Sequence, residues 1–304
     1  MQLKTKIKLF GLVVALGILG MSFAYVFKGE IIHTLKLGVR ISSFNIPGGV
    51  VLFDKSKVGE PFEITGVVGR RADLIKESMV PRNSNYAPIE WEEFELIEGY
   101  PTRFRWEITV PDEQELFFAQ SINWHSSRMV DPILMRPALI FIVTGQSNAS
   151  GASEHVSVSP TDNVYYGALG DKGINWRPAH DPGILHGKGS VWPLVGNTLQ
   201  DKHGIAIGFI NLAAGGTQLA HWMPGEPFYE RLISALNQTQ ASGLTAVLLH
   251  QGESDHTIST EDYKSGLRSI IDQSRSETGW NEIPWLVSTA TLNDHKLNES
   301  VRQA

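Results

Sequence analysis

The residues best suited to chemistry lie in the turn Gly145-Gln-Ser-Asn148, which follows the apolar run 140–143. A continuous apolar run of this kind is typical of a strand buried in a parallel sheet. Ser147 would then stand at the carboxyl end of that strand, where open α/β sheets bind their ligands. A serine in that place can act as the nucleophile of an acyl transfer. A polar turn that simply contains a serine is the alternative.

Two later apolar runs also end in polar turns that contain glycine. Ala213-Ala-Gly-Gly-Thr217 follows the first of them, and His250-Gln-Gly-Glu-Ser-Asp255 follows the second. If the three strands are parallel, all three turns lie at one edge of the sheet. The backbone N–H of Gly215 or Gly216 and the side-chain amide of Gln251 could then stabilise an oxyanion that forms beside the serine.

A nucleotide site, a nucleophile elbow and a metal site each fit these turns less well. No Gly-x-Gly-x-x-Gly or Walker sequence follows any of the runs, so a nucleotide site is not indicated. Ala149 stands where the nucleophile elbow of α/β-hydrolases has its last glycine, which disfavours that class. Glu253, Asp255 and His256 are a conceivable metal site, but carboxylates in such a position more often begin a helix. We therefore expect no metal.

The segment that must position these turns alternates strands with helices. We expect strands at 139–143, 205–212, 246–250 and 284–288, and helices at 190–202, 227–238, 260–276 and from near Asn298. This order is the signature of a parallel sheet covered by helices. The stretch 144–189 has little periodicity and is expected to be a long loop.

Residues 29–136 have the period-two pattern of antiparallel strands instead. Phe104, Trp106, Ile108 and Val110 alternate with polar residues, and turn-forming stretches separate such runs. The pattern predicts a small antiparallel β-sandwich domain, followed by an α/β domain at 137–304. No group in the first domain has catalytic spacing.

Residues 1–27 have the layout of a signal peptide or a membrane anchor. Three lysines precede the apolar run 9–21, and the small-x-small pattern Ser22-Phe-Ala24 follows it. The chain is therefore expected to be secreted or periplasmic, with membrane attachment if the segment is retained.

Charge and composition exclude further classes of function. The chain has 26 basic and 32 acidic residues, a net charge of −6, which argues against a nucleic-acid partner. It has no cysteine, so disulfides, thiolate metal sites and a cysteine nucleophile are all excluded.

Taken together, the three turns, with Trp222 after the second, resemble the sialate O-acetylesterase and acetylxylan esterase family of SGNH hydrolases over residues 137–304. The resemblance implies a flavodoxin-like three-layer α/β domain. It also implies a serine esterase that removes acetyl groups from carbohydrate hydroxyls through an acetyl-serine intermediate, without a cofactor. Its site residues are then Ser147 as nucleophile, Gly215, Gly216 and Gln251 in the oxyanion hole, and Glu253 as partner of the catalytic histidine.

The sequence departs from the family pattern at the catalytic base. The family takes its histidine from an Asp-x-x-His motif after the fifth strand, and no such motif follows residue 288, where Asp294 and His295 are adjacent. We therefore expect the last strand and its histidine to lie beyond Ala304. His221 and His250, near the predicted site, are the alternatives.

The substrate contacts and the activity itself leave alternatives open. Trp192, Trp222 and the 144–189 stretch are candidates for sugar contacts, since aromatic faces suit pyranose rings, although both tryptophans could equally be packing residues. Instead of an acetylesterase, the chain could be a non-catalytic carbohydrate-binding pseudo-esterase. A lipid or thioester hydrolase of the same superfamily is a further alternative.

Overall fold

The computed structural model describes residues 41–44, 49–68, 74–81, 92–93, 95–96, 103–113, 115–123, 126–129, 133–153, 162–181, 189–290 and 304. The expected signal or anchor at 1–27, the expected last helix and His295 lie outside these residues. Within the described part of the chain, no helix is long and apolar enough to cross a membrane.

A parallel sheet forms the centre of the second half of the chain. Its strands run in the order β11-β13-β10-β14-β15, and every neighbouring pair is parallel. The strands are β10 (Ile133–Gly145), β11 (Val164–Gly170), β13 (Ala206–Asn211), β14 (Ala246–His250) and β15 (Trp285–Val287). The four strands expected from the sequence are therefore present, and the strand that ends before Ser147 is the central one.

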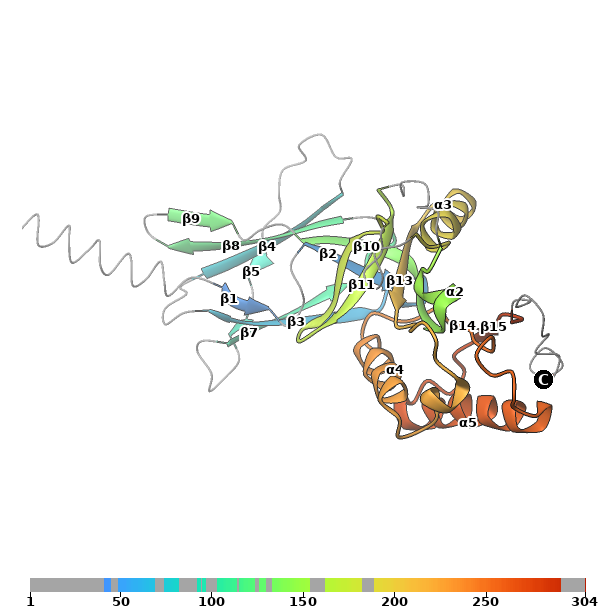
Figure 1. The fold of residues 1–304 in the computed structure, drawn as a ribbon. Coiled ribbons are helices and arrows are strands. Elements are labelled where there is room, and N and C mark those ends of the chain that lie inside the picture. Colours follow the sequence, from blue (N-terminus) through green and yellow to red (C-terminus); the bar gives the residue numbers. More distant parts are fainter. Residues whose placement is uncertain are drawn as a thin grey trace, which may run out of the picture.

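Helices cover both faces of this sheet, which makes three layers. The helix α3 (Trp192–His203) lies on one face, and α4 (Pro227–Gln238) and α5 (Thr260–Thr278) lie on the other (Figure 1). Strand β10 serves both cores: Ile140 and Ile142 pack with the α4 and α5 side, whereas Phe141 and Val143 pack with the α3 side. The three-layer α/β fold is thus confirmed.

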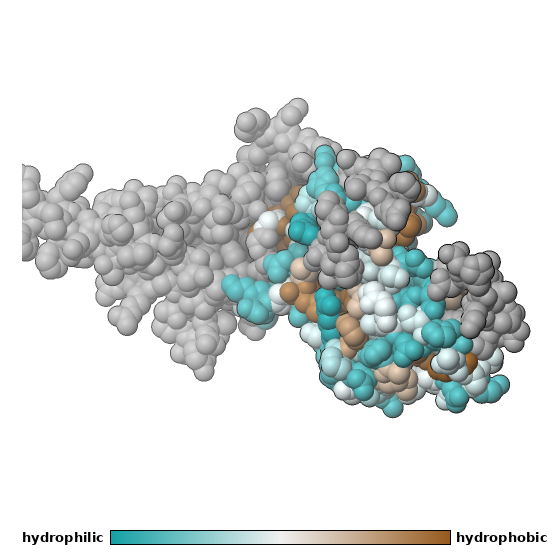
Figure 2. All heavy atoms as spheres, viewed as in Figure 1, coloured by the Kyte–Doolittle hydropathy of each residue, from teal (hydrophilic) through white to brown (hydrophobic). Residues whose placement is uncertain are grey.

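The amphipathic pattern of α4 explains how one of these layers is held. Leu232 and Leu236 are fully buried against the sheet, while Glu230 and Arg231 are exposed. In Figure 2 the surface over α4 and α5 is accordingly mostly hydrophilic. Burying side chains of this kind contributes about 2 kcal/mol each.

The stretch 144–189 differs from the expected loop. It contains the parallel strand β11 and the antiparallel strand β12 (Gly173–Pro178), which together form a hairpin. Gly167 interrupts the apolar pattern of β11 because a Cβ there would lie 2.6 Å from the Ile174 side chain and 2.8 Å from the Trp176 ring. A strand whose packing requires glycine has little sequence signal.

The strands that the first half of the chain pairs with one another are antiparallel, as expected. One sheet has the order β1-β3-β7-β6, formed by β1 (Ile41–Phe44), β3 (Pro61–Val68), β7 (Arg103–Thr109) and β6 (Glu95–Leu96). The other strands of this half belong to the same sheet as the parallel strands. They are β2 (Val50–Asp54), β4 (Leu74–Pro81), β5 (Glu92–Glu93), β8 (Glu115–Asn123) and β9 (Ser126–Met129).

The expected domain boundary at 136/137 falls inside one continuous strand. β10 begins at Ile133, where it pairs with β8, and β2 pairs with its residues 134–138 in parallel. Arg136 is buried there, and its guanidinium donates hydrogen bonds to the Tyr165 hydroxyl and the Asn163 side chain. The two halves therefore share a strand rather than being joined by a linker.

Candidate active site

The turn after β10 depends on a glycine that no other residue can replace without displacement. Gly145 has a φ of +114°, and a Cβ at this position would lie 2.0 Å from the His250 carbonyl oxygen. The Gln146 N–H donates to that same oxygen at 3.0 Å. Ser147 then begins the short helix α2 (Ser147–Ser150), with its side chain half-buried. The first turn is thus packed directly on the third.

The turn after β13 places Gly215 against the serine. The Ala214 N–H donates to the Gly145 carbonyl at 2.8 Å, and a Cβ on Gly215 would lie 3.7 Å from the Ser147 Cβ. Gly216 has a φ of +75°, and a Cβ there would meet nothing within 4 Å. Among the described residues, the backbone N–H groups of Ser147 and Gly215 have no hydrogen-bond partner. Two backbone donors beside the serine are therefore free.

Gln251, the expected side-chain donor of the oxyanion hole, has both hydrogens of its amide bound within the turns. Its side chain is buried, and the amide nitrogen donates to the Thr217 carbonyl at 2.7 Å and to an Asp255 carboxylate oxygen at 2.8 Å. Both amide hydrogens are engaged, so donation to an oxyanion would require one of these bonds to break. In this structure Gln251 ties the second turn to the third.

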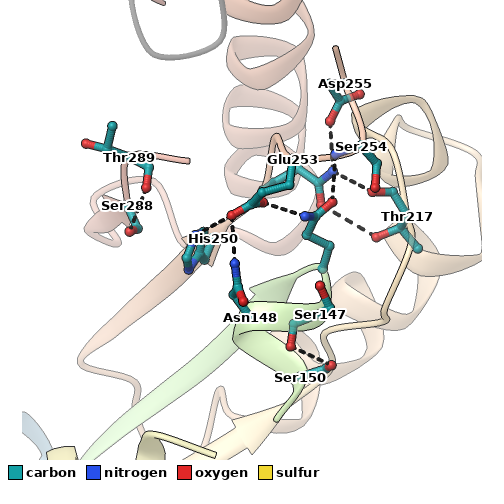
Figure 3. A network of polar contacts seen from close by, with 12 residues as sticks. Ser147, Asn148, Ser150, Thr217, His250, Glu253, Ser254, Asp255, Ser288 and Thr289 are labelled. Carbon is teal, nitrogen blue, oxygen red and sulfur yellow. Dashed lines mark hydrogen bonds and ion pairs between the residues drawn. The ribbon is translucent and has the colours of Figure 1, made fainter. Parts of the chain in front are cut away.

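Glu253 is the centre of the polar network, as Figure 3 shows. One of its carboxylate oxygens lies 2.9 Å from His250 Nε2 and accepts a hydrogen bond from the Asn148 amide at 2.8 Å, and the other accepts one from the Gln146 amide. The Gln146 side-chain oxygen in turn accepts from the Ser254 N–H at 3.2 Å. Glu253 therefore partners His250, and it also fixes both residues that flank Ser147.

The two histidines on these turns have different surroundings. His221 lies in the short helix η2 (Leu219–Trp222), where its Nδ1 accepts from the Gln218 N–H at 2.9 Å. This bond makes His221 part of a local cap. His250 is paired through Nε2 with Glu253, and its side chain lies on the side of Ser288 and Thr289 in Figure 3. Of the two alternatives to the family histidine, His250 alone has a carboxylate partner.

Trp192 and Trp222 are packing residues in this structure. Trp192 is 9% exposed and donates from its ring nitrogen to the Ala149 carbonyl at 2.7 Å. Trp222 is 2% exposed and donates to the Thr217 hydroxyl at 3.1 Å. Because their faces pack against the apolar cores, they support the turns rather than offer a surface for sugar.

Three residues have a supporting role that was not assigned to them from the sequence. Gln146 and Asn148 bind Glu253, and Asp255 accepts the Leu219 N–H at 2.9 Å. All three are polar residues inside the turn motifs, which is a signal in the sequence, but spacing alone does not say what they bind.

The carboxylates of Glu253 and Asp255 both accept hydrogen bonds within the turns. The described residues hold no group of three side chains suited to a metal.

Tyr263 connects this network to α5. Its hydroxyl donates to the Gln251 carbonyl at 3.0 Å. Burial raises the pKa of Tyr263 well above its usual value, and the charges of Asp255 and Glu253 raise it further. The tyrosine therefore stays neutral and remains a donor at ordinary pH.

A three-layer α/β fold with a serine turn at the carboxyl end of its central parallel strand is consistent with the class of SGNH hydrolases. Comparison with known proteins narrows the class. The model of the family described as carbohydrate esterase, sialic acid-specific acetylesterase, matches residues 137–304. The chain belongs to this carbohydrate esterase family.

Two relatives illustrate how far the similarity extends. A probable carbohydrate esterase of Arabidopsis thaliana is 24% identical over 196 residues, which cover 55% of this chain and 74% of the relative. A crystal structure of a carbohydrate acetylesterase from Xanthomonas citri is 16% identical, with a TM-score of 0.51 over 83% of this chain and 60% of that one. At these identities the structural match supports the fold alone.

Proposed function

We propose that this chain is a serine esterase that removes O-acetyl groups from carbohydrates of the sialate or xylan type, with Ser147 as its nucleophile. One observation carries the proposal. Ser147 is half-exposed and stands beside two backbone N–H groups, its own and that of Gly215, that have no partner among the described residues. Membership of a carbohydrate esterase family supports the substrate class.

The proposed reaction has two steps. The Ser147 oxygen attacks the acetyl carbonyl carbon while its proton passes to a histidine base, and the two free N–H groups bind the oxyanion. The bond to the sugar oxygen then breaks, and the histidine returns the proton to that oxygen. Water hydrolyses the acetyl-serine by the same route and releases acetate.

The resemblance implies that the base is the histidine of an Asp-x-x-His motif. The described geometry does not identify a base. The family motif Asp-x-x-His does not occur between β15 and Ala304. His250 is the histidine of the described turns that already has a carboxylate partner. A His250→Asn variant tests it: as the base, its loss would abolish activity at every pH, whereas a supporting role would leave a reduced rate with an unchanged pH profile.

The test of the nucleophile is hydrolysis of p-nitrophenyl acetate and of acetylated xylan by Ser147→Ala. We expect activity to fall at least about 10³-fold, because the nucleophile and its base act as a unit. Ser150→Ala is the matched control. Ser150 lies in the same helical turn and only donates from its hydroxyl to the Ser147 carbonyl at 3.0 Å. Undiminished turnover in Ser147→Ala would refute the assignment.

The acyl and sugar specificity need separate measurements. Faster hydrolysis of acetyl than of butyryl and longer esters is expected, and the reverse order would favour a lipid or thioester hydrolase. Release of acetate from acetylated xylan is then compared with release from O-acetylated sialic acid. The substrate with the higher kcat/KM identifies the sugar.

A further inference from the structure

A second concave site lies away from the three turns. It is a cleft of about 470 Å³ formed by β2, the beginning of β3, the tip of the β11–β12 hairpin and the turn between α4 and β14. This volume is within the usual range of small-ligand sites. Residues that matter for its chemistry are Lys57, Glu60, Phe62, Lys172, Trp176 and Gln238.

The cleft and Ser147 lie at opposite ends of the parallel strands. Residues 240–242 line the cleft and come just before β14, whereas His250 ends β14 beside the serine turn. Five strand residues span about 16 Å. The part of a ligand that is bound in the cleft therefore cannot react at Ser147. If the ligand is a long chain, another part of it can reach the serine.

Hydrogen bonds next to the cleft join two of its walls, β2 and the turn before β14. The Asp54 N–H donates to the Ser242 carbonyl at 2.6 Å, and the Thr245 hydroxyl donates to the Asp54 carboxylate. Gly243 allows this approach, since a Cβ there would lie 2.7 Å from the Asp54 Cβ. The walls are thus held in place before any ligand arrives, which lowers the entropic cost of binding.

Two side chains of the cleft have unmet hydrogen-bonding capacity. Among the described residues, neither end of the Gln238 amide has a partner, and its oxygen is buried. The six-membered ring of Trp176 packs over Gly208, where a Cβ would lie 2.7 Å from ring atoms. Among the described residues, the indole N–H of Trp176 has no hydrogen-bond partner. Because the oxygen of the Gln238 amide is its buried end, the amide nitrogen is the end that a ligand can reach, and a ligand hydroxyl can accept a hydrogen bond from it.

The charges of the cleft cancel. Two lysines and two glutamates line it, and one of each, Lys57 and Glu60, form an ion pair at 2.8 Å. Phe62 and Trp176 add aromatic surface. Neutral polar donors and acceptors beside aromatic rings suit a ligand that is neutral, rich in hydroxyl groups and apolar on its ring faces.

We propose that this cleft is a second binding site for a neutral oligosaccharide, which holds a polysaccharide chain at a distance from Ser147. The choice of ligand rests in part on the proposed function, because carbohydrate is the substrate class of the family. Gln238 and Trp176 are its polar contacts.

Titration calorimetry of the full chain with deacetylated xylo-, cello- and manno-oligosaccharides tests the proposal. These probes contain no ester, so binding is measured without turnover. At least one of the three is expected to bind. Gln238→Leu is expected to weaken that binding at least about 10-fold, and Trp176→Phe, which keeps the ring packing, to weaken it less.

Gln200→Leu in α3 is the matched control, since Gln200 is also a half-buried helical glutamine but lies outside the cleft. It should bind like the wild type. Gln238→Leu should unfold at the same or a slightly higher denaturant concentration, because its amide has no partner to lose. Lack of binding by the wild type to all three probes, or equal binding by Gln238→Leu, would overturn the proposal.

The assay of p-nitrophenyl acetate separates this inference from the proposed function. The Gln238→Leu variant should keep its rate on this small ester and lose rate on acetylated polysaccharide through a higher KM. Oligosaccharide binding in a chain without esterase activity would refute the proposed function and leave the second site standing. Esterase activity without oligosaccharide binding would refute the second site and leave the proposed function standing.

Discussion

The two ends of the parallel sheet each carry an ion pair between residues three positions apart, and the pairs differ in their surroundings. At the carboxyl end His250 and Glu253 lie 2.9 Å apart, and the glutamate side chain is 9% exposed. At the amino end Lys57 and Glu60 lie 2.8 Å apart, and that glutamate is 52% exposed. The distances are alike, but only the first glutamate also binds two side-chain amides.

The difference fits the two uses proposed for these ends. At the carboxyl end the buried side chains are bound to one another, and the donors that remain free are backbone N–H groups beside Ser147. Such a site is fixed before the substrate arrives, as electrostatic stabilisation of a transition state requires. At the amino end the backbone is fixed and a side chain, Gln238, remains unpaired. That end is suited to binding rather than to chemistry.

Gly145→Ala is expected to have the largest effect on stability. The new Cβ would overlap the His250 carbonyl oxygen, and the φ of +114° disfavours any side chain. We expect a loss of about 4 kcal/mol or more in the free energy of unfolding. Gly204→Ala, with a φ of +72° and nothing within 4 Å of the Cβ, is the control and should cost only about 1 kcal/mol. Equal costs in urea unfolding would show that the contact between the turns is unimportant.

The two glutamates test the comparison directly. Glu253→Gln should cost about 2–3 kcal/mol, because a neutral amide cannot accept from His250, Asn148 and Gln146 together. Glu60→Gln should cost less than about 1 kcal/mol, since its pair is exposed to solvent. Esterase rate is measured alongside urea unfolding, and only the first variant should lower it. Similar losses in both variants would contradict the difference between the two ends.

Much of the fold could be predicted because its core elements have simple periodicity. The structure gives α4 and β14 the limits expected from the sequence, 227–238 and 246–250. β11 could not be found this way, because its packing against β12 requires Gly167 in place of an apolar residue. The sequence also could not predict that both halves share β10. Arg136 interrupts the apolar pattern of this strand, and its partners Tyr165 and Asn163 are known only from the structure.

The positions of the three turns of the candidate site could be predicted from the sequence. The side-chain hydrogen bonds between the turns could not. Glycine and polar residues after buried strands identified the three turns, and the pairing of β13 and β14 with β10 brings them together. The hydrogen bonds of the Gln251 amide to Thr217 and Asp255 could not be predicted from spacing. Hydrogen bonds between residues far apart in sequence, such as Gln146 with Glu253, leave no periodic signal.

Tyr263→Phe is expected to have the smallest effect, about 1 kcal/mol at neutral pH, because one hydrogen bond to the Gln251 carbonyl is lost. The pH dependence has a definite sign. The folded-state pKa of Tyr263 is raised, so its contribution is complete below about pH 10, the usual tyrosine pKa, and is lost as the pH rises above it. The variant should therefore lose stability less steeply in alkali than the wild type, as measured by urea unfolding across that range.

Tyr229→Phe separates the role of this tyrosine in the turns from its titration. The pKa of Tyr229 is also raised, mainly by burial, but its hydroxyl donates to Glu277 at 3.1 Å, a contact between α4 and α5. Both variants should be less sensitive to alkali than the wild type. Only Tyr263→Phe should also lower the esterase rate at neutral pH, because it alone releases the turn that carries Gln251 and Glu253. A lower rate in both variants would show that the packing of α5, rather than the bond to the third turn, holds the site in place.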